Sequence, residues 1–351
     1  MSVSIYDVAK RSGLSVVTVS RVINQASSVR ESNRQKVLQA MKELNYRPNS
    51  AARSLARGKT GTIGLVLATL QDSVFEGIVR EVNEQLEELG YFLALSIDHS
   101  FNSKLNRVSN YLFQKDRVDG IILLSSIHEV EYIQELRSKK IPFVLIDNHD
   151  LSVKATMIRV DNYAGGALAA QHLLDLGHRD IGLIYGPQHL LSARERKQGF
   201  EQVLADNGIT PVISTEAEFE IGDGFRVAQN WIKQGVHLTA IATADDFMAW
   251  GVIQAYHEAG LRVPHDMSVI GYDDQDFACD VHPSLTTVRQ PTESIGREAV
   301  KRLAAMLNQD LEVGKSEVEG QATTQGLYHE RQELIKFQPQ LLVRSSTSSI
   351  I

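Results

Sequence analysis

The chain has 351 residues, of which 43% are hydrophobic and 23% charged, with one cysteine and a formal net charge of −7. This composition excludes a disordered or fibrous protein, and a lone cysteine excludes an internal disulfide and a multi-cysteine metal site. No stretch approaches the roughly 18 consecutive apolar residues of a membrane span, and Asp7 and Lys10 interrupt the N-terminus. We therefore expect a cytoplasmic protein with no signal peptide and no membrane partner.

Charge is distributed unevenly along the chain. Residues 1–60 contain 11 basic and three acidic residues, a net charge of +8, so the rest of the chain carries −15. A basic N-terminal segment on an acidic body indicates that this segment meets a polyanion such as a nucleic acid. A merely solvated basic surface would give the same balance.

The first predicted element is a short helix from Ile5 to Ser12. Ser4 followed three residues later by Asp7 is typical of a capping box, and apolar side chains recur on one helical face. Gly13 can adopt the left-handed conformation that ends such a helix.

Residues 16–23, VVTVSRVI, have the β-branched composition of a strand, but their spacing favours a second helix. At about 100° per residue, Val19, Val22 and Ile23 lie on one side of this helix and polar residues on the other. Ser15 can cap its N-terminus. The prediction therefore requires packing to override propensity.

A third helix is predicted from about Glu31 to Leu44, with Arg30 at its cap position. Two short helices joined by a glycine-containing turn and braced by a third predict a helix-turn-helix unit, although a small bundle without DNA-binding activity has the same pattern. The second helix of such a unit enters the major groove. Its candidates for contacts with bases are Val16, Val17 and Arg21. Residues suited to phosphate contacts are Ser4, Tyr6, Ser15, Thr18, Ser20 and Asn24.

The segments IYDVAKRSGLSVVTVSRVIN and YRPNSAARSLARGKTGTIGLV resemble the lactose/galactose repressor family (LacI/GalR) of bacterial transcription regulators. The resemblance implies a hinge helix from about Asn49 to Arg57, preceded by Pro48. It also implies that Leu55 is an apolar wedge in the minor groove of the DNA, where insertion kinks the duplex. Further DNA contacts implied in this segment are Asn49, Ala52 and Arg53. A phosphate loop ending in GKT is excluded because Arg53 stands where that motif needs glycine.

From Thr62 onward, short apolar runs alternate with longer helical patterns. Runs of this length suit strands buried on both faces of a parallel sheet, and two successive series predict two doubly wound α/β subdomains. Ligands of such sheets bind beyond the carboxyl ends of the strands. The runs are IGLVLA, YFLALSI, GIILLS and FVLID in the first series, and IGLIYG, AIATA and SVIGY in the second.

We expect three regions along the chain. A helix-turn-helix DNA-binding domain spans residues 1–47, a hinge helix and linker spans 48–60, and an effector-binding and dimerisation domain spans 61–351. Within that last domain, the N-subdomain is expected at about 61–160 and 290–318. The C-subdomain is expected at about 161–289 and 319–351.

Polar and aromatic residues follow many of the predicted strands. Carboxylates, an arginine and an aromatic ring are what a polyhydroxylated ligand requires, since they accept from or donate to hydroxyls and stack on the apolar face of a sugar. An aspartate after a strand can equally cap the next helix, and this alternative stays open for Asp161, Asp246 and Asp274. The other residues at these positions are Ser73, Val74, Phe75, Ser125, Asp147, Ser192, Arg196, Phe219, Asp245, Asp273 and Gln290.

The body also resembles the periplasmic sugar-binding-protein fold, in which the ligand lies between the subdomains. In this pattern Arg196 and Asp273 clamp hydroxyls, and Val74 and Phe75 line the floor of the cleft. Leu190 stands where members that bind nucleobases can have a polar residue, so the resemblance favours a sugar over a purine. The remaining implied contacts are Asp147, Phe219, Asp245 and Gln290.

Motifs for enzymes and for oligomerisation tails are absent. The chain has no G-x-S-x-G, no H-E-x-x-H and no catalytic set, and GDGFRV lacks the third glycine of a dinucleotide loop, so neither cofactor nor metal is expected. About twenty residues between Leu311 and Leu334, with no clear periodicity, form an insertion before QLLVRSS, the expected last strand. The C-terminal end lacks heptads, which gives no sign of a tetramer-forming coiled coil.

These features together predict a homodimeric transcription regulator that binds double-stranded, pseudo-palindromic operator DNA. A small-molecule effector, a sugar or a derivative of one, would control its DNA affinity by closing the body. Three other hypotheses stay open: a sugar-binding protein without a DNA response, a sugar-modifying enzyme, and a DNA binder that responds to no ligand.

Overall fold

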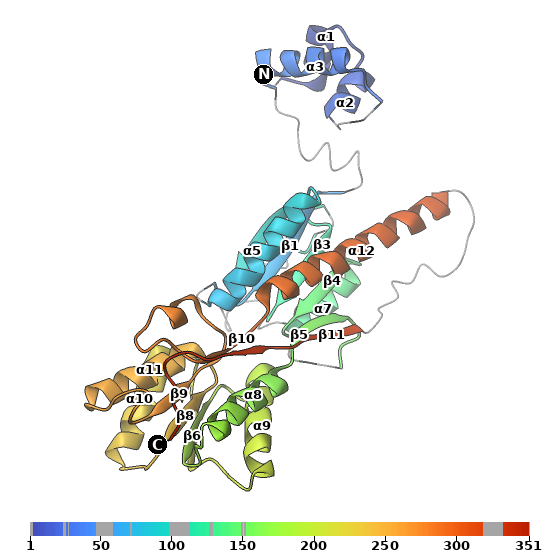
Figure 1. The fold of residues 1–351 in the computed structure, drawn as a ribbon. Coiled ribbons are helices and arrows are strands. Elements are labelled where there is room, and N and C mark those ends of the chain that lie inside the picture. Colours follow the sequence, from blue (N-terminus) through green and yellow to red (C-terminus); the bar gives the residue numbers. More distant parts are fainter. Residues whose placement is uncertain are drawn as a thin grey trace.

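The computed structural model describes most of the chain, and its elements are drawn in Figure 1. Predicted DNA contacts at Asn24, Asn49, Ala52, Arg53 and Leu55 lie outside the described residues, as does nearly all of the predicted hinge. Within the described part, no helix is long and apolar enough to cross a membrane. The described residues are 3–23, 26, 28–46, 59–70, 72–97, 112–114, 116–125, 129–148, 150, 152–318 and 333–350.

The N-terminal unit consists of α1 (Ile5–Ser12), α2 (Val16–Ile23) and α3 (Glu31–Glu43). Val19 and Val22 of α2 are buried against apolar residues of the other two helices. This packing explains why a β-branched segment forms a helix, since the three helices bury one shared apolar core. The predicted helix-turn-helix unit is therefore confirmed.

Caps define the ends of these helices. The Ser4 backbone N–H donates to the Asp7 carboxylate at 2.8 Å, and the Thr18 N–H donates to the Ser15 hydroxyl at 3.2 Å. Gly13 ends α1 with a φ of +70°, which glycine adopts without a steric penalty. Arg30 provides no side-chain cap for α3.

The N-subdomain contains a six-stranded parallel sheet in the order β11-β5-β4-β3-β1-β2. Helices α5 and α12 pack on one face and α7 on the other, so the central strands are buried on both faces. Its strands are β1 (Thr62–Leu67), β2 (Phe92–Ile97), β3 (Gly120–Leu124), β4 (Phe143–Ile146), β5 (Thr156–Val160) and β11 (Glu333–Phe337). Its helices are α5 (Ser73–Glu88), α7 (Glu129–Ser138) and α12 (Thr292–Val318).

The C-subdomain contains a four-stranded parallel sheet in the order β7-β6-β8-β9. Helices α8 and α9 cover one face, and α10 and α11 cover the other. Its strands are β6 (Ile181–Tyr185), β7 (Ile213–Glu216), β8 (Ala240–Thr243) and β9 (Ser268–Ile270), and the short helix η1 (Asp276–Cys279) follows β9. Its α-helices are α8 (Asn162–Asp175), α9 (Leu191–Asp206), α10 (Ile221–Lys233) and α11 (Asp246–Glu258).

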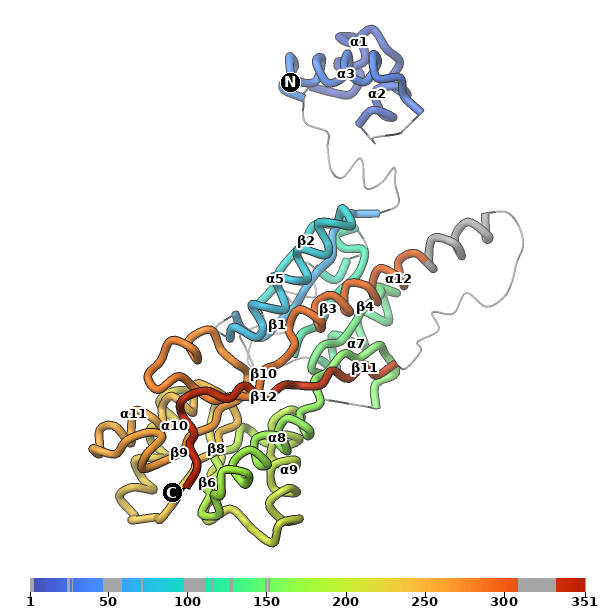
Figure 2. Tube along the Cα trace, viewed as in Figure 1, coloured from blue at the N-terminus to red at the C-terminus, as the bar shows by residue number. Residues whose placement is uncertain are grey.

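The chain passes between the subdomains three times, and Figure 2 lets the reader follow each passage. These passages lie between β5 and α8, between β10 (Thr287–Arg289) and α12, and between β11 and β12 (Gln340–Leu342). Strands β10 and β12 form a small antiparallel sheet. The polar residues that follow the strands of both sheets thus meet near these passages.

One predicted boundary is wrong. Residues 319–351 were assigned to the C-subdomain, but β11 pairs in parallel with β5 in the N-subdomain sheet, from Glu333 opposite Thr156 to Phe337 opposite Val160. The alternating apolar residues of β11 explain this, since Ile335 and Phe337 pack against the core of the N-subdomain. Helix α12 also continues to Val318, so the start of the predicted insertion is helical.

Candidate functional sites

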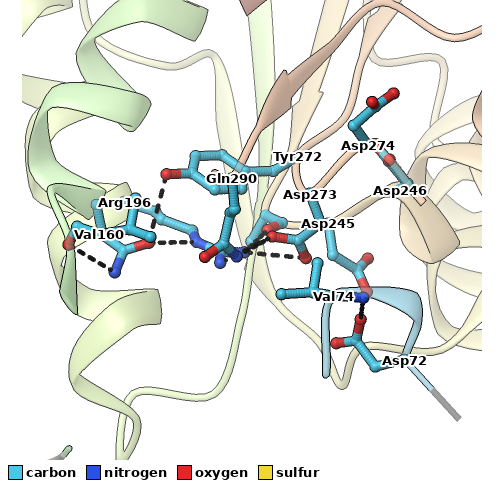
Figure 3. Close-up of polar contacts among 12 residues, drawn as sticks. Asp72, Val74, Val160, Arg196, Asp245, Asp246, Tyr272, Asp273, Asp274 and Gln290 are labelled. Atoms are coloured by element: carbon cyan, nitrogen blue, oxygen red, sulfur yellow. Dashed lines mark hydrogen bonds and ion pairs between the residues drawn. The ribbon is translucent and has the colours of Figure 1, made fainter. Parts of the chain in front are cut away.

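The centre of the candidate effector site is an ion pair between Arg196 of α9 and Asp273, which follows β9. Arg196 Nη2 lies 3.0 Å from Asp273 Oδ1, and both side chains are buried. The Gln290 amide donates to the same oxygen at 2.6 Å. Figure 3 shows this group of side chains between the two subdomains. The structure therefore brings together three residues that the sequence predicted.

Arg196 is held in a fixed orientation by further contacts. Its Nε donates to the Asn162 side chain at 3.0 Å, and its Nη1 donates to the Ala244 carbonyl at 2.6 Å. The guanidinium lies over the Tyr272 ring, 3.8 Å from its centroid. Burial lowers the pKa of Arg196, but the charges of Asp273, Tyr272 and Asp147 together outweigh burial, so the net pKa is raised. Arg196 therefore stays charged in the closed site.

Asp245 and Asp246 begin α11 and have different surroundings. One carboxylate oxygen of Asp245 accepts the Met248 backbone N–H at 2.8 Å, which makes Asp245 the N-cap of the helix. Asp246 accepts the Thr287 hydroxyl at 2.6 Å and the Gln275 backbone N–H at 2.8 Å. Burial raises the pKa of each carboxyl well above its usual value. Asp246 is thus a buried structural link rather than a helix cap.

Asp72, Ser73 and Gln275 connect the two subdomains. The Gln275 side-chain oxygen accepts from the Ser73 backbone N–H at 2.9 Å and from its hydroxyl at 2.5 Å. Its amide nitrogen donates to Asp72 at 2.7 Å. Sequence analysis missed Asp72 and Gln275. Each directly neighbours a predicted position, but neither carries a local sequence signal of its own.

A cavity of about 410 Å³ lies next to the ion pair. Its walls come from the start of α5, the loop after β9 and the start of α12. Predicted residues Ser73, Val74, Asp273 and Gln290 line it, together with Arg80, which was not predicted. This volume lies within the range of small-molecule binding pockets.

Other predicted residues lie around this centre. Ser125 and Asp147 end β3 and β4 with φ of +45° and +51°, in a region that few non-glycine residues occupy outside functional sites and turns. The charge of Asp147 contributes to the raised pKa of Arg196, so the two side chains lie within electrostatic range. Ser192 is buried in the first turn of α9, and Leu190 occupies the N-cap position of that helix.

The two predicted aromatic residues pack against different cores. Phe75 is partly buried against the core of the N-subdomain, and Phe219 against that of the C-subdomain. The position of Phe219 depends on a glycine, because a Cβ at Gly186 would lie 2.5 Å from its ring.

The two remaining predicted aspartates have structural partners. The carboxylate of Asp161 accepts the Ala164 N–H at 3.1 Å and caps α8, which confirms the alternative interpretation for this residue. Asp274 forms ion pairs with Arg289 and Arg344 at 2.6 and 2.5 Å. These pairs tie the loop after β9 to β10 and to the segment after β12.

In the N-terminal unit, α2 exposes the side chains predicted to contact DNA. Val17 is 61% exposed and Arg21 is exposed, whereas Val16 is half-buried against the core of the unit. Tyr6 is exposed at the start of α1. The Ser15 and Thr18 hydroxyls lie 2.9 Å apart at the N-terminus of α2. This arrangement presents one face of α2 to a partner.

Comparison with known proteins decides the family. A sequence profile described as bacterial regulatory proteins, lacI family, matches residues 4–49, and one for a periplasmic binding protein-like domain matches residues 170–324. The HTH-type transcriptional repressor PurR of Haemophilus influenzae is 35% identical over 353 residues, covering 99% of each chain. The chain belongs to the lacI family of bacterial regulatory proteins. The ribose operon repressor of Escherichia coli is 36% identical, covering 86% of this lacI-family chain and 92% of its own.

Solved structures agree with this assignment. A lac repressor dimer bound to operator and an anti-inducer superposes with a TM-score of 0.83 at 31% identity, covering 99% of this chain and 100% of the other. A complex of the transcriptional regulator CelR with cellobiose gives a TM-score of 0.71 at 29% identity, with 98% and 99% coverage. The predicted fold and the predicted role as a DNA-binding transcriptional regulator are both confirmed.

Proposed function

We propose that this lacI-family regulator is a repressor whose operator affinity is set by a sugar, or a derivative of one, bound between its subdomains. The observation that carries the proposal is the buried Arg196–Asp273 pair with Gln290 beside it, next to a cavity of about 410 Å³. A guanidinium donor and a carboxylate acceptor held at fixed positions are the groups that recognise vicinal hydroxyls.

The relatives support a sugar as the ligand class. One relative is named for the ribose operon, and one structural neighbour was solved with cellobiose. Leu190 places an apolar side chain at the start of α9, which offers no hydrogen-bonding partner to a nucleobase edge. We propose Ser73, Val74, Ser125, Asp147, Ser192, Phe219 and Asp245 as further contacts of the closed site.

On the DNA side, we propose a homodimer that binds a pseudo-palindromic operator. Two copies of α2 would enter successive major grooves, with Arg21 and Val17 on base edges, because a two-fold dimer matches two-fold DNA. Residues 48–60 would form the hinge that contacts the minor groove through Leu55. The lac repressor neighbour, described as a dimer bound to operator, supports this arrangement.

The two sites would communicate through the relative position of the subdomains. Gln275 bonds to Ser73 only when the subdomains are close together, so a ligand that favours closure also favours this contact. Closure would change the relative position of the two N-subdomains in the dimer, to which the hinges attach. It would thereby change the fraction of molecules whose hinges can bind DNA. Operator and effector then change each other's affinity reciprocally, typically by about 1 to 3 kcal/mol.

We further propose that the protein releases the bound sugar without altering it chemically, since the family relatives are regulators. A panel of sugars and sugar phosphates screened by thermal shift tests the ligand site, because a ligand at 100 times its dissociation constant stabilises by about 2.7 kcal/mol. A hit should shift wild type but not Arg196→Lys, which keeps the charge but loses the bidentate geometry. Arg226→Lys, at an exposed arginine, is the matched control.

The same ligand then decides between the rival functions. Altered affinity for an operator duplex, selected from random sequences, supports the proposal. Unaltered operator affinity despite bound sugar would indicate a sugar-binding protein without a DNA response. Release of a chemically changed sugar would indicate an enzyme, and operator binding with no ligand response would indicate a DNA binder alone.

A further inference from the structure

The cleft around Arg196 holds more carboxylates than basic side chains, although Arg80 and Arg289 line the neighbouring cavity. Five buried or half-buried carboxylates lie within electrostatic range of Arg196 or of one another, and Asp273 alone among them forms an ion pair within the described part of the chain. Its partner, Arg196, is the basic residue at the centre of the group (Figure 3). The nearby Arg289 is paired with Asp274, outside this set. The five carboxylates belong to Asp72, Asp147, Asp245, Asp246 and Asp273.

Two of these carboxylates have an oxygen available to a ligand. Asp245 is 2% exposed, and one of its oxygens caps α11 while no described residue donates to the other. Asp72 accepts the Val74 N–H and the Gln275 amide through Oδ1, and no described residue donates to its Oδ2. Asp246, by contrast, uses both oxygens within the protein. Asp72 and Asp245 come from different subdomains, and the charge of Asp72 acts on Asp245, so the two side chains lie within electrostatic range of each other.

Leaving these two groups without a cation is costly. Burial, together with the charge of Asp273, raises the pKa of Asp72 to about 6 and that of Asp245 well above its usual value. A buried carboxylate is stabilised only by a proton, hydrogen-bond donors or an opposite charge. The Val74, Gln275 and Met248 contacts supply some donors, but no described lysine or arginine forms an ion pair with either group. The charge of Arg196 offsets part of this cost, but Arg196 is paired with Asp273, so a proton or the ligand supplies the remaining positive charge.

We propose that the effector carries a protonated amine on a polyhydroxylated frame, as an amino sugar does, with the ammonium between Asp72 and Asp245. This inference rests on the proposed function, because it concerns the same cleft. The hydroxyls would meet Arg196, Asp273 and Gln290, while the three N–H donors of the ammonium meet the unpaired oxygens. A phosphorylated sugar is disfavoured, since a phosphate would add negative charge to a site that already has an excess.

Titration with the full chain tests this charge preference. D-glucosamine, D-galactosamine and D-mannosamine are each compared with the parent hexose, and D-glucose 6-phosphate serves as the anionic probe. At pH 7.5 at least one amine should bind at least about tenfold more tightly than its parent hexose. Its advantage should shrink at pH 5, which lies below the pKa of about 6 for Asp72, so that this carboxyl is mostly protonated.

Variants connect this preference to the two carboxylates. Asp245→Asn keeps a helix-capping side chain, so the protein should fold while the preference for the amine falls to within about threefold. Asp72→Asn should act in the same way. Asp266→Asn, at an exposed aspartate paired with Arg262, is the matched control and should leave the preference intact.

Each outcome decides one of the two proposals. If a neutral hexose or the phosphate binds as tightly as every amine, the amine inference is overturned and the sugar site stands. An amine preference that survives both Asp245→Asn and Asp72→Asn also overturns it. If no probe binds while the chain still binds selected operator DNA, the sugar effector itself is rejected, and the amine inference with it.

Discussion

Arg159 on β5 and Glu195 on α9 form a bidentate ion pair that joins the two subdomains. Arg159 Nη1 and Nη2 lie 3.2 and 3.0 Å from the two Glu195 carboxylate oxygens, and the arginine side chain is fully buried. Glu195 directly precedes Arg196, so the pair fixes the N-terminal part of α9 relative to the N-subdomain sheet. A cleft arginine is thereby tied to the subdomain on the opposite side of the cleft.

Breaking this pair should destabilise the body. Glu195→Ala leaves Arg159 buried without its partner, and we expect the free energy of unfolding to fall by about 3 to 5 kcal/mol. The double variant Arg159→Met with Glu195→Leu should recover most of that loss because no buried charge remains. Urea unfolding measures both, and Asp223→Ala at an exposed pair should cost less than about 1 kcal/mol. Equal losses for the single and double variants would contradict this account.

The stability of the protein should fall as pH rises through the pKa of Asp72. Burial and the charge of Asp273 raise this pKa to about 6 in the folded chain. The pKa of an aspartate in the unfolded chain is about 3.9. The folded chain thus holds this proton more tightly, and ionisation costs stability from about pH 4 upward until the loss is complete above about pH 7.

Asp72→Asn removes this dependence while keeping the cap of α5. We expect the variant to be more stable than wild type at pH 7.5, by on the order of 1 to 3 kcal/mol, and to gain nothing at pH 4. Urea unfolding at both pH values gives the difference. The control Asp266→Asn should show no gain at pH 7.5. A gain of the same size at both pH values would mean that titration of Asp72 is not its cause.

Gln275→Leu should weaken the closed form of the body. The substitution removes the acceptor for the Ser73 N–H and hydroxyl and the donor to Asp72, and each such hydrogen bond contributes about 0.5 to 1.5 kcal/mol. We expect the affinity for the ligand found by thermal shift to fall by about tenfold, with little change in operator binding without ligand. Gln171→Leu, at an exposed glutamine bonded to Asp175, is the control. Unchanged ligand affinity would exclude a role for this contact in closure.

Arg21→Ala should reduce operator binding selectively. An arginine on a base edge contributes about 1 to 3 kcal/mol to discrimination, whereas a phosphate contact contributes alike on every sequence. We therefore expect a larger loss on the selected operator than on random duplex, measured by fluorescence anisotropy at fixed salt. Lys10→Ala, which removes one exposed charge from α1, should weaken both complexes equally. If Arg21→Ala lost the same affinity for both duplexes, Arg21 would contact the DNA backbone rather than a base edge.

The sequence predicted the strands that are apolar throughout and missed those that are not. All seven predicted runs contain strands. Six of these strands are almost wholly buried on both faces of their sheets, whereas β2, at a sheet edge, is apolar but partly exposed. β5, TMIRV, was missed because Arg159 interrupts its apolar pattern, and only Glu195, 36 residues away, makes that burial possible. β7 was missed because, at the edge of its sheet, it alternates between half-buried and exposed residues. β10 was missed because it has only three residues and polar residues flank it, whereas β12 lies in QLLVRSS, the expected last strand.

The candidate site was predicted best where one residue alone carries the chemical signal. Arg196, Asp273 and Gln290 stand in recognisable motifs after strands, and the structure joins them. Asp72 and Gln275 lie 203 positions apart, and the role of each depends on its hydrogen bond to the other. No local pattern indicates such a contact. The alternatives for Asp161, Asp246 and Asp274 likewise needed their hydrogen-bond partners to be resolved.

The most direct test of the central claim is the operator affinity of the full chain with and without its bound ligand. The operator duplex is selected from random sequences, and anisotropy is recorded for wild type and Arg196→Lys at one salt concentration. We predict that saturating ligand changes the wild-type dissociation constant by about 5- to 150-fold. Arg196→Lys should bind the operator normally and show little or no change. Ligand bound to the wild type with an unchanged operator dissociation constant would contradict the account.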